Sequence, residues 1–372
     1  MNVLVTGGAG FIGSHVVDRL VADGHDVTVL DNLDPQVHGP GASPPAWLPP
    51  AIRFIRGDVR DAEAVARALD GAEAVIHLAA AVGVGQSMYL PHYYTSVNVD
   101  GQGVLMEAMV KDPARWRRFV VASSMSIYGE GAYECARHGG IAPEPRPESR
   151  LASGAWEATC PQCGTVVNPA LTNEDKPLQY TSIYAITKKT QEELALCFGA
   201  AYAIPTLALR FFNVYGSRQA LSNPYTGAAA IFMSRLKNGR APLIFEDGRQ
   251  TRDFIHVSDV AAAVTRALEA DAGIAGSVNV CTGRRTGIAE LAVLLGERLG
   301  MPIPPEITGR YRVGDIRHCV GDPARAREAL GFAASVSLAE GLDELIAWAA
   351  DEAAEDRIPV GLAELERQNL VR

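Results

Sequence analysis

The chain lacks the sequence features of proteins that bind nucleic acids or membranes. It has 34 Lys and Arg against 43 Asp and Glu, a formal net charge of -9, and no run rich in Lys or Arg. Because polyanions are bound by clustered basic side chains, neither a nucleic acid nor an anionic membrane is expected as a partner. No apolar run reaches the roughly 18 residues of a membrane-spanning helix, and no charged-then-apolar leader precedes the first strand. We therefore expect a cytoplasmic protein.

Cysteine is scarce, with six residues in 372. Three are isolated and are expected at core or neutral positions: Cys197, Cys281 and Cys319. The others lie with a histidine in Cys135-Ala-Arg-His138 and, 21 residues further on, Cys160-Pro-Gln-Cys163-Gly. This spacing is typical of a closed tetrahedral zinc site, whereas a disulfide is not expected in a reducing compartment. We expect one structural zinc on Cys135, His138, Cys160 and Cys163, with free or redox-active thiols as the alternative.

A glycine-rich segment, TGGAGFIG, lies near the start of the chain between an apolar run at residues 3–5 and a helical pattern at 11–21. Glycines there permit a tight turn and let backbone N–H groups approach a pyrophosphate at the helix N-terminus. The next strand ends in Asp31, 18 residues after Gly13. A carboxylate there accepts hydrogen bonds from the adenosine ribose and repels a 2'-phosphate, so the pattern predicts NAD rather than NADP. The expected cofactor residues are Gly7, Gly10, Phe11, Ile12, Gly13, Asp31 and Asn32.

Strand-like runs at residues 53–55, 74–78 and 119–123 alternate with helical patterns at 62–69 and 98–110. This alternation predicts an α/β fold with a parallel sheet. Ligands of such sheets lie outside the carboxyl ends of the strands, so GDV at 57–59 and HLAA at 77–80 should line the cofactor. Asp58 is expected at the adenine amino group, with a turn-capping role as the alternative. The further cofactor residues are Asp58, Val59, Leu78, Ala79, Ala80 and Asn98.

Tyr184 and Lys188 are four residues apart, which places them on one face of a helix. A phenol titrates near 10, but an adjacent ammonium and a positive nicotinamide ring favour the phenolate. We expect Tyr184 to be the general base and Lys188 to tune it and hold the nicotinamide ribose. Together with the glycine-rich turn, this pair predicts a redox enzyme.

The segments TGGAGFIGSH, GDV, HLAA, ASSMSIYG, YAITK, RFFNVYG and TRDFIHVSDV resemble, in this order, the NAD-dependent epimerase/dehydratase family of extended short-chain dehydrogenases/reductases. The resemblance implies a Rossmann-type doubly wound parallel sheet, a smaller mixed α/β substrate domain that binds a nucleoside diphosphate sugar, and a homodimer. It implies that the Ser124 hydroxyl hydrogen-bonds the reacting sugar oxygen. The expected divisions are a Rossmann domain at 1–130, continued by 177–212 and 251–281; a zinc-ribbon-like insertion at 131–176; a substrate domain at 213–250 and 282–345; and a tail at 346–372.

The residues after Ser124 narrow the choice among the reactions of this family. Sugar dehydratases of the family carry Asp-Glu there, whereas this chain has Met125 and Ser126, which supply neither an acid nor a second base. The glutamate of the decarboxylases is also absent. What remains is epimerisation at C4, in which hydride moves to NAD and returns to the other face of a 4-keto sugar.

The same resemblance assigns the substrate side. Arg252 and Arg312 would hold the two phosphates, although each alone is compatible with a surface ion pair. Asp253 and Asp315 are expected to orient these arginines, and the backbone near residues 243–245 to meet the base. The expected substrate residues are Gln86, Ser87, Ser124, Ser126, Asn213, Arg252 and Arg312.

The insertion, with LDNLDPQVHG and SNPYTGAAAIF, resembles bacterial epimerases that convert dTDP-L-rhamnose to dTDP-6-deoxy-L-talose. A UDP-hexose or UDP-uronate 4-epimerase is the alternative. A more distant one is a non-catalytic NAD-binding module that engages a partner protein through the insertion.

Overall fold

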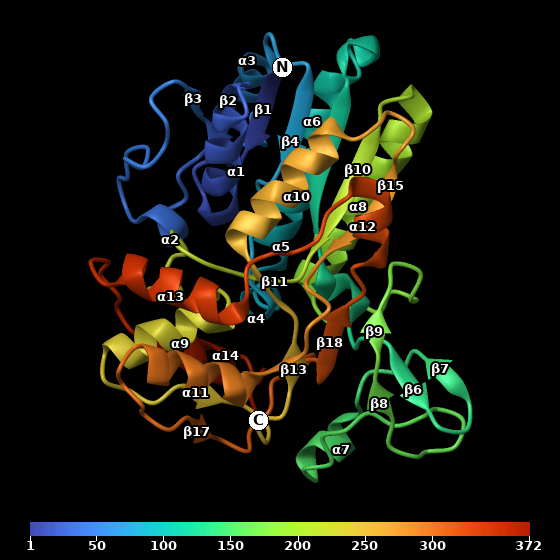
Figure 1. Cartoon of the computed structure of the whole chain (residues 1–372), viewed down its shortest axis with the longest axis vertical. Coiled ribbons are helices and arrows are strands. Elements are labelled where there is room, and N and C mark those ends of the chain that lie inside the picture. The colour runs from blue at the N-terminus through green and yellow to red at the C-terminus, as the bar shows by residue number, and fades with distance from the viewer.

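A computed structural model describes residues 1–372 (Figure 1). Its main element is a sheet with strand order β15-β10-β5-β4-β1-β2-β3, in which all neighbours are parallel. The strands are β1 (Asn2–Thr6), β2 (Asp26–Asp31), β3 (Arg53–Arg56), β4 (Ala74–His77), β5 (Arg118–Ser124), β10 (Thr206–Phe211) and β15 (Gly276–Val280). The central strands β4 and β5 are buried almost throughout, as continuous apolar runs covered on both faces require. The predicted doubly wound α/β fold is confirmed.

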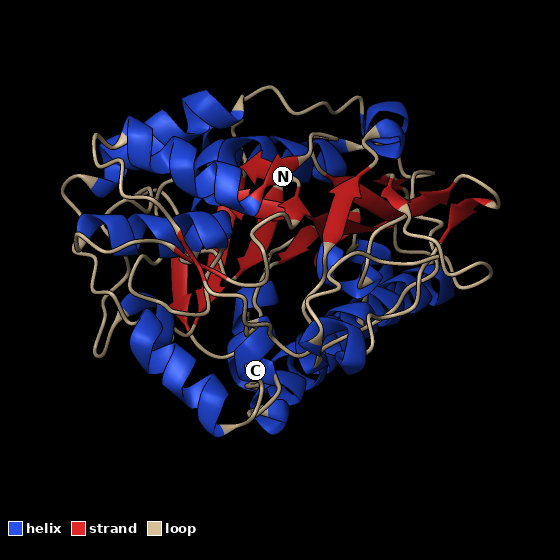
Figure 2. Ribbon diagram, turned by 90° about the horizontal axis from the view of Figure 1, so that it is seen from below, coloured by secondary structure: helices blue, strands red, loops and turns tan.

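Helices cover both faces of this sheet, as Figure 2 shows. Val3 and Val5 of β1 pack in one core cluster and Leu4 in another, because successive strand residues point to opposite faces. The first cluster includes residues of α1 (Phe11–Ala22), α10 (Val257–Glu269) and α12 (Ala324–Leu330). The second includes residues of α3 (Ala62–Leu69), α6 (Gly101–Met109) and α8 (Ile183–Tyr202).

The strand order reverses at β1, which lies between β2 and β4. At its last residue Thr6 is in register with Leu30 of β2 and with His77 of β4. Loops that leave these strands in opposite directions open a crevice, and parallel sheets bind their ligands there. The glycine-rich turn and HLAA both lie at this edge.

One helix differs from its predicted bounds. The pattern at 98–110 predicted a single helix, whereas the structure has α5 (Pro91–Thr95), a π-helical segment (Ser96–Asp100) and α6 in unbroken succession. Proline is favoured at the first helical position, so the helical region begins at Pro91. The π-helical segment contains Asn98.

A second, smaller unit packs its own core below the carboxyl edge of the main sheet in Figure 1. Its helices are α9 (Ala228–Lys237), α11 (Ile288–Arg298), α13 (Leu338–Ala349) and α14 (Ile358–Arg367). A mixed sheet joins β16 (Thr286–Gly287), β13 (Thr251–Arg252), β18 (His318–Gly321) and β9 (Leu171–Thr172). The parallel pairs are β11 (Asn213–Tyr215) with β14 (Phe254–His256), and β12 (Leu243–Ile244) with β17 (Glu306–Ile307). Short helices are α2 (Pro35–His38), α4 (Val84–Ser87) and 3-10 turns at Pro113–Arg115 and Met125–Tyr128.

The stretch predicted as an insertion projects beside β18 in Figure 1. It contains a three-stranded antiparallel sheet with a small core of Tyr133, Cys135, Ala158, Cys160 and Val167. Its elements are β6 (Tyr133–Cys135), β7 (Gly139–Ile141), α7 (Glu148–Ala152) and β8 (Asn168–Pro169). Strand β9 then pairs with β18 and joins the insertion to the mixed sheet.

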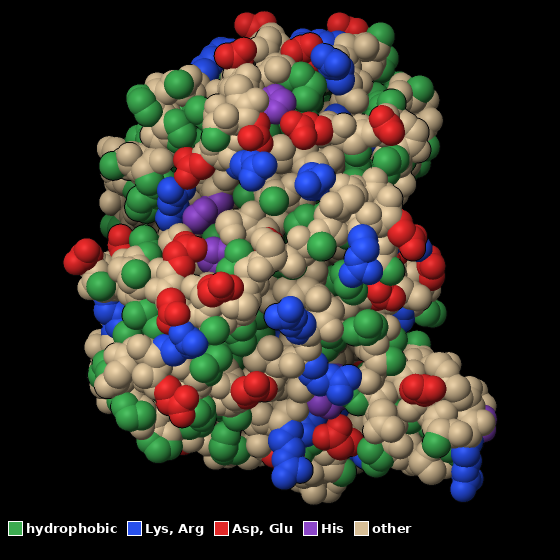
Figure 3. All heavy atoms as spheres, in the orientation of Figure 1, with side chains coloured by type: hydrophobic (Ala, Val, Ile, Leu, Met, Phe, Trp, Pro, Cys, Tyr) green, Lys and Arg blue, Asp and Glu red, His purple; other side chains and the backbone are tan.

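No helix is both long and apolar enough to cross a bilayer. On the face in Figure 3, Lys and Arg side chains are interspersed with Asp and Glu.

Candidate active site

The glycine-rich turn between β1 and α1 can hold a dinucleotide. Gly7 has a φ of +71°, and a Cβ there would lie 2.8 Å from the backbone nitrogen of Ala79. A Cβ at Gly13 would lie 2.1 Å from the carbonyl oxygen of Gly7. Helix α1 starts after Gly10 with no side-chain cap, so its first N–H groups are available to an anion. The backbone therefore leaves room, and donors, for a pyrophosphate.

Polar side chains at the ends of β2 and β3 lie where an adenosine would bind. The Asp31 carboxylate accepts hydrogen bonds from the backbone N–H of Ala9 at 3.0 Å and of Leu33 at 2.9 Å. Asn32 donates to Asp58 at 3.1 Å, and Arg60 pairs with Asp58 at 2.8 Å. Hydrogen bonds from Arg60 lower the pKa of Asp58 to about 2. Asp31 thus connects the end of β2 to the glycine-rich turn. The carboxylate of Asp58 accepts hydrogen bonds from Arg60 and so stabilises the turn after β3.

Asn98 braces the loop after β4. It is fully buried; its Oδ1 accepts from the N–H of Ala81 at 2.7 Å, and its Nδ2 donates to the Ala81 carbonyl and to Thr187 Oγ1. All its hydrogen-bonding groups therefore have protein partners. Asn98 acts on the cofactor side by holding the loop that contains Leu78, Ala79 and Ala80.

The predicted catalytic pair comes together from β5 and α8. Ser124 ends β5 and Tyr184 lies in the first turn of α8, where the Ser124 side chain acts to lower the pKa of the Tyr184 phenol. The Ser124 Oγ accepts from the N–H of Ser126 at 3.2 Å and from the Ser126 hydroxyl at 2.9 Å. Its own proton is thereby free for the phenol. The structure thus brings the predicted residues Ser124 and Tyr184 together.

Burial raises the pKa of the Tyr184 phenol, and the hydrogen bond from Ser124 opposes this. The expected lowering of this pKa needs both Lys188 and the positive nicotinamide ring; among the protein's own groups, desolvation outweighs the stabilising ones. Burial also lowers the pKa of Lys188 to about 7. In the protein framework alone the phenol therefore stays protonated, and burial weakens the preference of Lys188 for its charged form.

Lys188 is the first member of a buried hydrogen-bond chain that the sequence did not reveal. Its Nζ donates to Gln191 Oε1 at 2.7 Å, and Gln191 Nε2 lies 3.3 Å from His77 Nε2. His77 Nδ1 is 2.7 Å from Thr6 Oγ1. Because the Gln191 amide donates, His77 accepts at Nε2 and donates from Nδ1. The only sequence signal for Gln191 is its place three residues after Lys188.

Gln86 and Ser87 hold Tyr94 and Tyr184 in place through hydrogen bonds. Ser87 is fully buried and accepts from the N–H of Tyr184 at 3.0 Å. Gln86 exchanges hydrogen bonds with Gln36 and accepts one from the Tyr94 hydroxyl. The ring of Tyr94 packs edge-on against Tyr184, with centroids 6.4 Å apart. These residues fix the start of α8.

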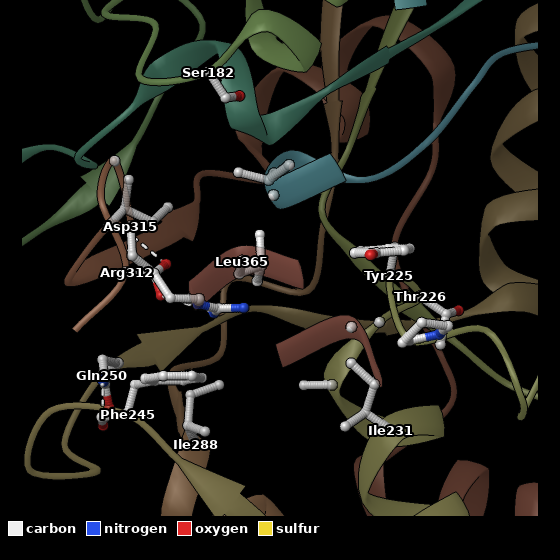
Figure 4. A pocket seen from close by; sticks show the side chains of 18 of the residues that line it. Ser182, Tyr225, Thr226, Ile231, Phe245, Gln250, Ile288, Arg312, Asp315 and Leu365 are labelled. Carbon is white, nitrogen blue, oxygen red and sulfur yellow. Dashed lines mark hydrogen bonds and ion pairs between the residues drawn. The ribbon is translucent and has the colours of Figure 1, made fainter. Parts of the chain in front are cut away.

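A cavity of about 330 Å³ extends from this catalytic end into the smaller unit (Figure 4). Met125, Ser126, Thr181 and Ser182 line it near the catalytic pair. Leu243, Phe245, Gln250 and Ile288 line the far end. Asn213 also lines the cavity, and its Oδ1 is buried without a hydrogen-bond partner. A buried acceptor without a partner is costly and fits a bound ligand that donates to it.

Both predicted arginines line this cavity. Asp315 accepts from Arg312 at 2.8 Å and from Arg252 at 3.4 Å, which confirms its predicted orienting role. The Arg312 guanidinium lies 4.8 Å from the Phe245 ring centroid. The expectation for Asp253 is wrong: its carboxylate accepts from Thr282, Gly283 and the N–H of Gly321, because it is buried below a backbone turn.

The C-terminal segment closes one wall of the cavity, which the sequence did not predict. Its lining residues come from α14 and the residues after it: Ile358, Gly361, Leu362, Leu365 and Leu370. Val371 forms a bridge with Arg312, and Tyr311 and Arg372 exchange backbone hydrogen bonds of 2.9 and 3.0 Å. The chain end is therefore anchored to the loop that carries Arg312. The only sequence signal for this wall of the cavity was the spacing of the apolar residues in α14.

The four predicted metal ligands converge in the insertion. Their ligand atoms all lie within 4.8 Å of one another, with His138 Nδ1 3.6 Å from Cys135 Sγ and 3.4 Å from Cys160 Sγ. Gly164 after the Cys160–Cys163 knuckle has a φ of +69°, the left-handed turn that such knuckles need. Three thiols and one imidazole nitrogen are a donor set that suits zinc.

Residues 3–147 and 158–281 match a family model described as the NAD dependent epimerase/dehydratase family. A relative, the dTDP-L-rhamnose 4-epimerase of Burkholderia thailandensis, is 34% identical over 353 residues, which cover 94% of this chain and 95% of the relative. A UDP-glucose 4-epimerase of Thermotoga maritima, solved with UDP-glucose, has a TM-score of 0.74, 32% identity, and coverage of 94% of this chain and 98% of that chain. A UDP-glucuronic acid 4-epimerase of Bacillus cereus, solved with UDP-glucuronic acid and NAD, has a TM-score of 0.76, 25% identity, and coverage of 94% and 98%.

Proposed function

Since this chain belongs to the NAD-dependent epimerase/dehydratase family and is an NAD-dependent nucleotide-sugar 4-epimerase, we propose that it inverts C4 of dTDP-L-rhamnose to give dTDP-6-deoxy-L-talose. The observation that carries the chemistry is that Ser124 and Tyr184 come together beside Ser126 and Ser182, which line a cavity that two arginines also line. The Burkholderia relative supports the choice of sugar.

The lining of the cavity favours an uncharged deoxy sugar. Near the catalytic pair the lining side chains are apolar or hydroxylic, such as Val84, Met88, Met125 and Thr181. Arg252 and Arg312 are the only cations among the lining residues, and a diphosphate would engage both. A uronate would need a further cation for its C5 carboxylate, whereas a C6 methyl group needs only apolar contact.

The protein's part in catalysis follows from the geometry. Tyr184 takes the proton of the C4 hydroxyl and later returns it, while the Ser124 hydroxyl hydrogen-bonds the reacting oxygen. When bound, NAD supplies a reversible hydride acceptor, so the cycle has no net oxidation. We assign Lys188, which Gln191 holds, the role of stabilising the phenolate in its ammonium form, together with the positive nicotinamide ring. Arg252 and Arg312 keep the diphosphate bound while the 4-keto sugar turns over.

The cofactor site fits NAD on this chain's own residues. A Cβ would fill the cradle at Gly7 and Gly13, α1 begins without a side-chain cap, and Asp31 stands at the ribose position. We assign the NAD-binding domain to 1–130, 177–212 and 251–281. We assign the substrate domain to 213–250 and 282–345, with the insertion at 131–176 and the terminal segment at 346–372.

We also propose that Cys135, His138, Cys160 and Cys163 bind one structural zinc. These four side chains would fill all four coordination positions of a tetrahedral zinc, which leaves none for water or substrate. The metal would join β6 and β7 to the second half of the insertion.

The second candidate is a UDP-hexose 4-epimerase, which the likeness to the Thermotoga structure with UDP-glucose favours. Purified protein should be incubated separately with dTDP-L-rhamnose, UDP-glucose and UDP-glucuronic acid, and C4 inversion followed by NMR. We expect turnover of dTDP-L-rhamnose and at least about tenfold lower kcat/KM for the UDP-sugars. Preferred turnover of a UDP-sugar would overturn the assignment, and no inversion of any of the three would overturn the proposed chemistry.

A further inference from the structure

A cluster of charges, four of them buried and two partly exposed, joins the insertion to the proposed sugar-nucleotide cavity. From the insertion come Arg146 and Glu157; from the smaller unit come Glu246, Asp247 and Arg317; and Glu130 precedes the insertion. We name these six residues the insertion charge cluster. The side chains of Arg146 and Arg317 are 3% and 0% exposed, so their pairing is scarcely screened by water.

Arg146 uses every donor of its guanidinium. Its Nε donates to Glu130 at 3.1 Å; its two terminal nitrogens form a forked pair with Glu246 at 2.8 and 3.0 Å and also reach the carbonyl oxygens of Trp156 and Asp315, each at 3.0 Å. An arginine with five donors satisfied in one geometry fixes the position of each acceptor.

Two of those acceptors adjoin the nucleotide end of the cavity. Asp315 holds both Arg252 and Arg312 by its carboxylate and contacts Arg146 through its carbonyl. Glu246 follows Phe245, the ring beneath Arg312, and has a φ of +55°, a conformation that non-glycine residues seldom adopt. Arg146 thus contacts the backbone of Asp315 and the side chain of Glu246, on the two sides of the stacked Arg312–Phe245 pair.

Besides Arg146, Glu157 of the insertion contacts the loop of Asp315, through ion pairs with Arg317 and His318 after Asp315. A second cavity of about 280 Å³ lies there, lined among others by Pro145, Leu151, Tyr180 and Gly314. Because empty space provides no packing, the hydrogen bond from Arg146 is the direct restraint that the insertion places on the Asp315 backbone.

We propose that Arg146 is a positioning residue for nucleotide-sugar binding, through which the insertion sets the affinity of the cavity for the nucleoside diphosphate. This inference rests on the proposed function of the cavity. Arg146 touches neither the catalytic pair nor the NAD-binding turn. Its loss should therefore weaken ground-state and transition-state binding together and leave the chemical step largely intact.

The test compares Arg146→Gln, Arg146→Lys and the control Arg150→Gln. Arg150 lies in the same insertion, and its guanidinium donates to the Glu157 carbonyl. The probes are dTDP and UDP by calorimetry, and the preferred nucleotide sugar by kinetics. In Arg146→Gln we expect Kd and KM to rise about tenfold or more while kcat falls less than about threefold. Lysine, which keeps the charge without the fork, should give an intermediate rise in Kd.

NAD content and metal content are measured on the same samples. An unchanged Kd in folded Arg146→Gln, or an equal rise in Arg150→Gln, would overturn the inference. If Arg146→Gln does not fold, Arg146→Lys decides by the same criterion. Because dTDP and UDP binding needs no turnover, a wild-type protein that binds them without inverting any sugar would contradict only the proposed function.

Discussion

At the scale of single residues, the chemistry of the candidate active site depends on whether Ser124 and Tyr184 hold or accept a proton. Ser124 accepts two hydrogen bonds from Ser126, and its side chain acts to lower the pKa of the Tyr184 phenol. This directional chain needs only backbone and hydroxyl groups, so it forms without a charged partner. Burial then keeps the Tyr184 phenol protonated until positive charge is brought close to it.

Tyr184→Phe should keep NAD and nucleotide-sugar binding and lower kcat by about 10²–10⁴-fold, because it removes the proton acceptor and little volume. Steady-state kinetics with calorimetric binding checks this. Activity within about tenfold of the wild type would contradict the assignment of Tyr184 as the base.

His77 makes stability depend on pH. Burial, with Lys188 nearby, lowers its pKa from an ordinary 6.5 to about 3, so the folded state holds it neutral. Between these values the unfolded chain binds more protons, and stability therefore falls as the pH is lowered from 6.5 toward 3. Near pH 5 the loss from His77 alone should be about 2 kcal/mol.

Denaturant unfolding at several pH values between 7 and 5 tests this linkage. His77→Asn should flatten the profile, whereas the control His92→Asn, at an exposed position, should keep the wild-type slope. Parallel profiles for His77→Asn and the wild type would show that another group is responsible.

At the scale of elements, two segments outside the core sheet shape the nucleotide end of the cavity. The insertion reaches it through Arg146, and the C-terminal segment reaches it through α14 and the bridge between Val371 and Arg312. Each element is small, and each is held by a few specific contacts rather than by a large core.

Cys160→Ser should lose the proposed zinc and lower the melting temperature by about 5 °C, because a closed metal site contributes folding free energy to a small core. KM should rise more than kcat falls, since the insertion contacts the nucleotide end through Arg146. Elemental analysis and calorimetry are the measurements. Cys197→Ser, at an exposed and isolated thiol, is the control and should match the wild type in both.

A chain that ends at Gln368 should raise KM about three- to tenfold, because it loses Leu370 from the cavity wall and the pairing that anchors the Arg312 loop. NAD content should stay unchanged, since the segment lies far along the cavity from the glycine-rich turn. Kinetics and cofactor content after purification check both statements. An unchanged KM would show that the terminal residues do not shape the site.

At the scale of the whole molecule, the cofactor site and the sugar-nucleotide cavity are made by different parts of the chain. The proposed NAD site lies at the switch point of one continuous sheet, whereas the cavity lies between that sheet and the smaller unit. The two meet at the first turn of α8. This division allows a sugar nucleotide to exchange while the cofactor remains bound.

The purified protein should therefore retain NAD or NADH and turn over without added cofactor or reductant, because hydride returns to the sugar in every cycle. Absorbance of the reduced nicotinamide during turnover, with NMR of the sugar product, is the measurement. Stoichiometric NADH with an oxidised sugar as the final product would identify a dehydrogenase instead.

The sequence alone determined what depends on local pattern. Apolar runs and turns predicted the parallel sheet, the glycine spacing predicted the turn at Gly7, and the pairs Tyr184–Lys188 and Cys160–Cys163 marked two clusters. Each of these is a relation between residues a few positions apart, so helix, strand or turn geometry fixes it.

Only the tertiary structure decided which distant groups meet. No sequence pattern near Gln191 predicts its contact with His77, and none near Arg146 predicts its ion pair with Glu246. The role predicted for Asp253 was wrong because its hydrogen-bond partners come from another loop. The terminal Leu370 became part of the cavity wall in the same way. Such contacts depend on how whole elements pack, and close packing sets them through many weak contacts that leave no local pattern in the chain.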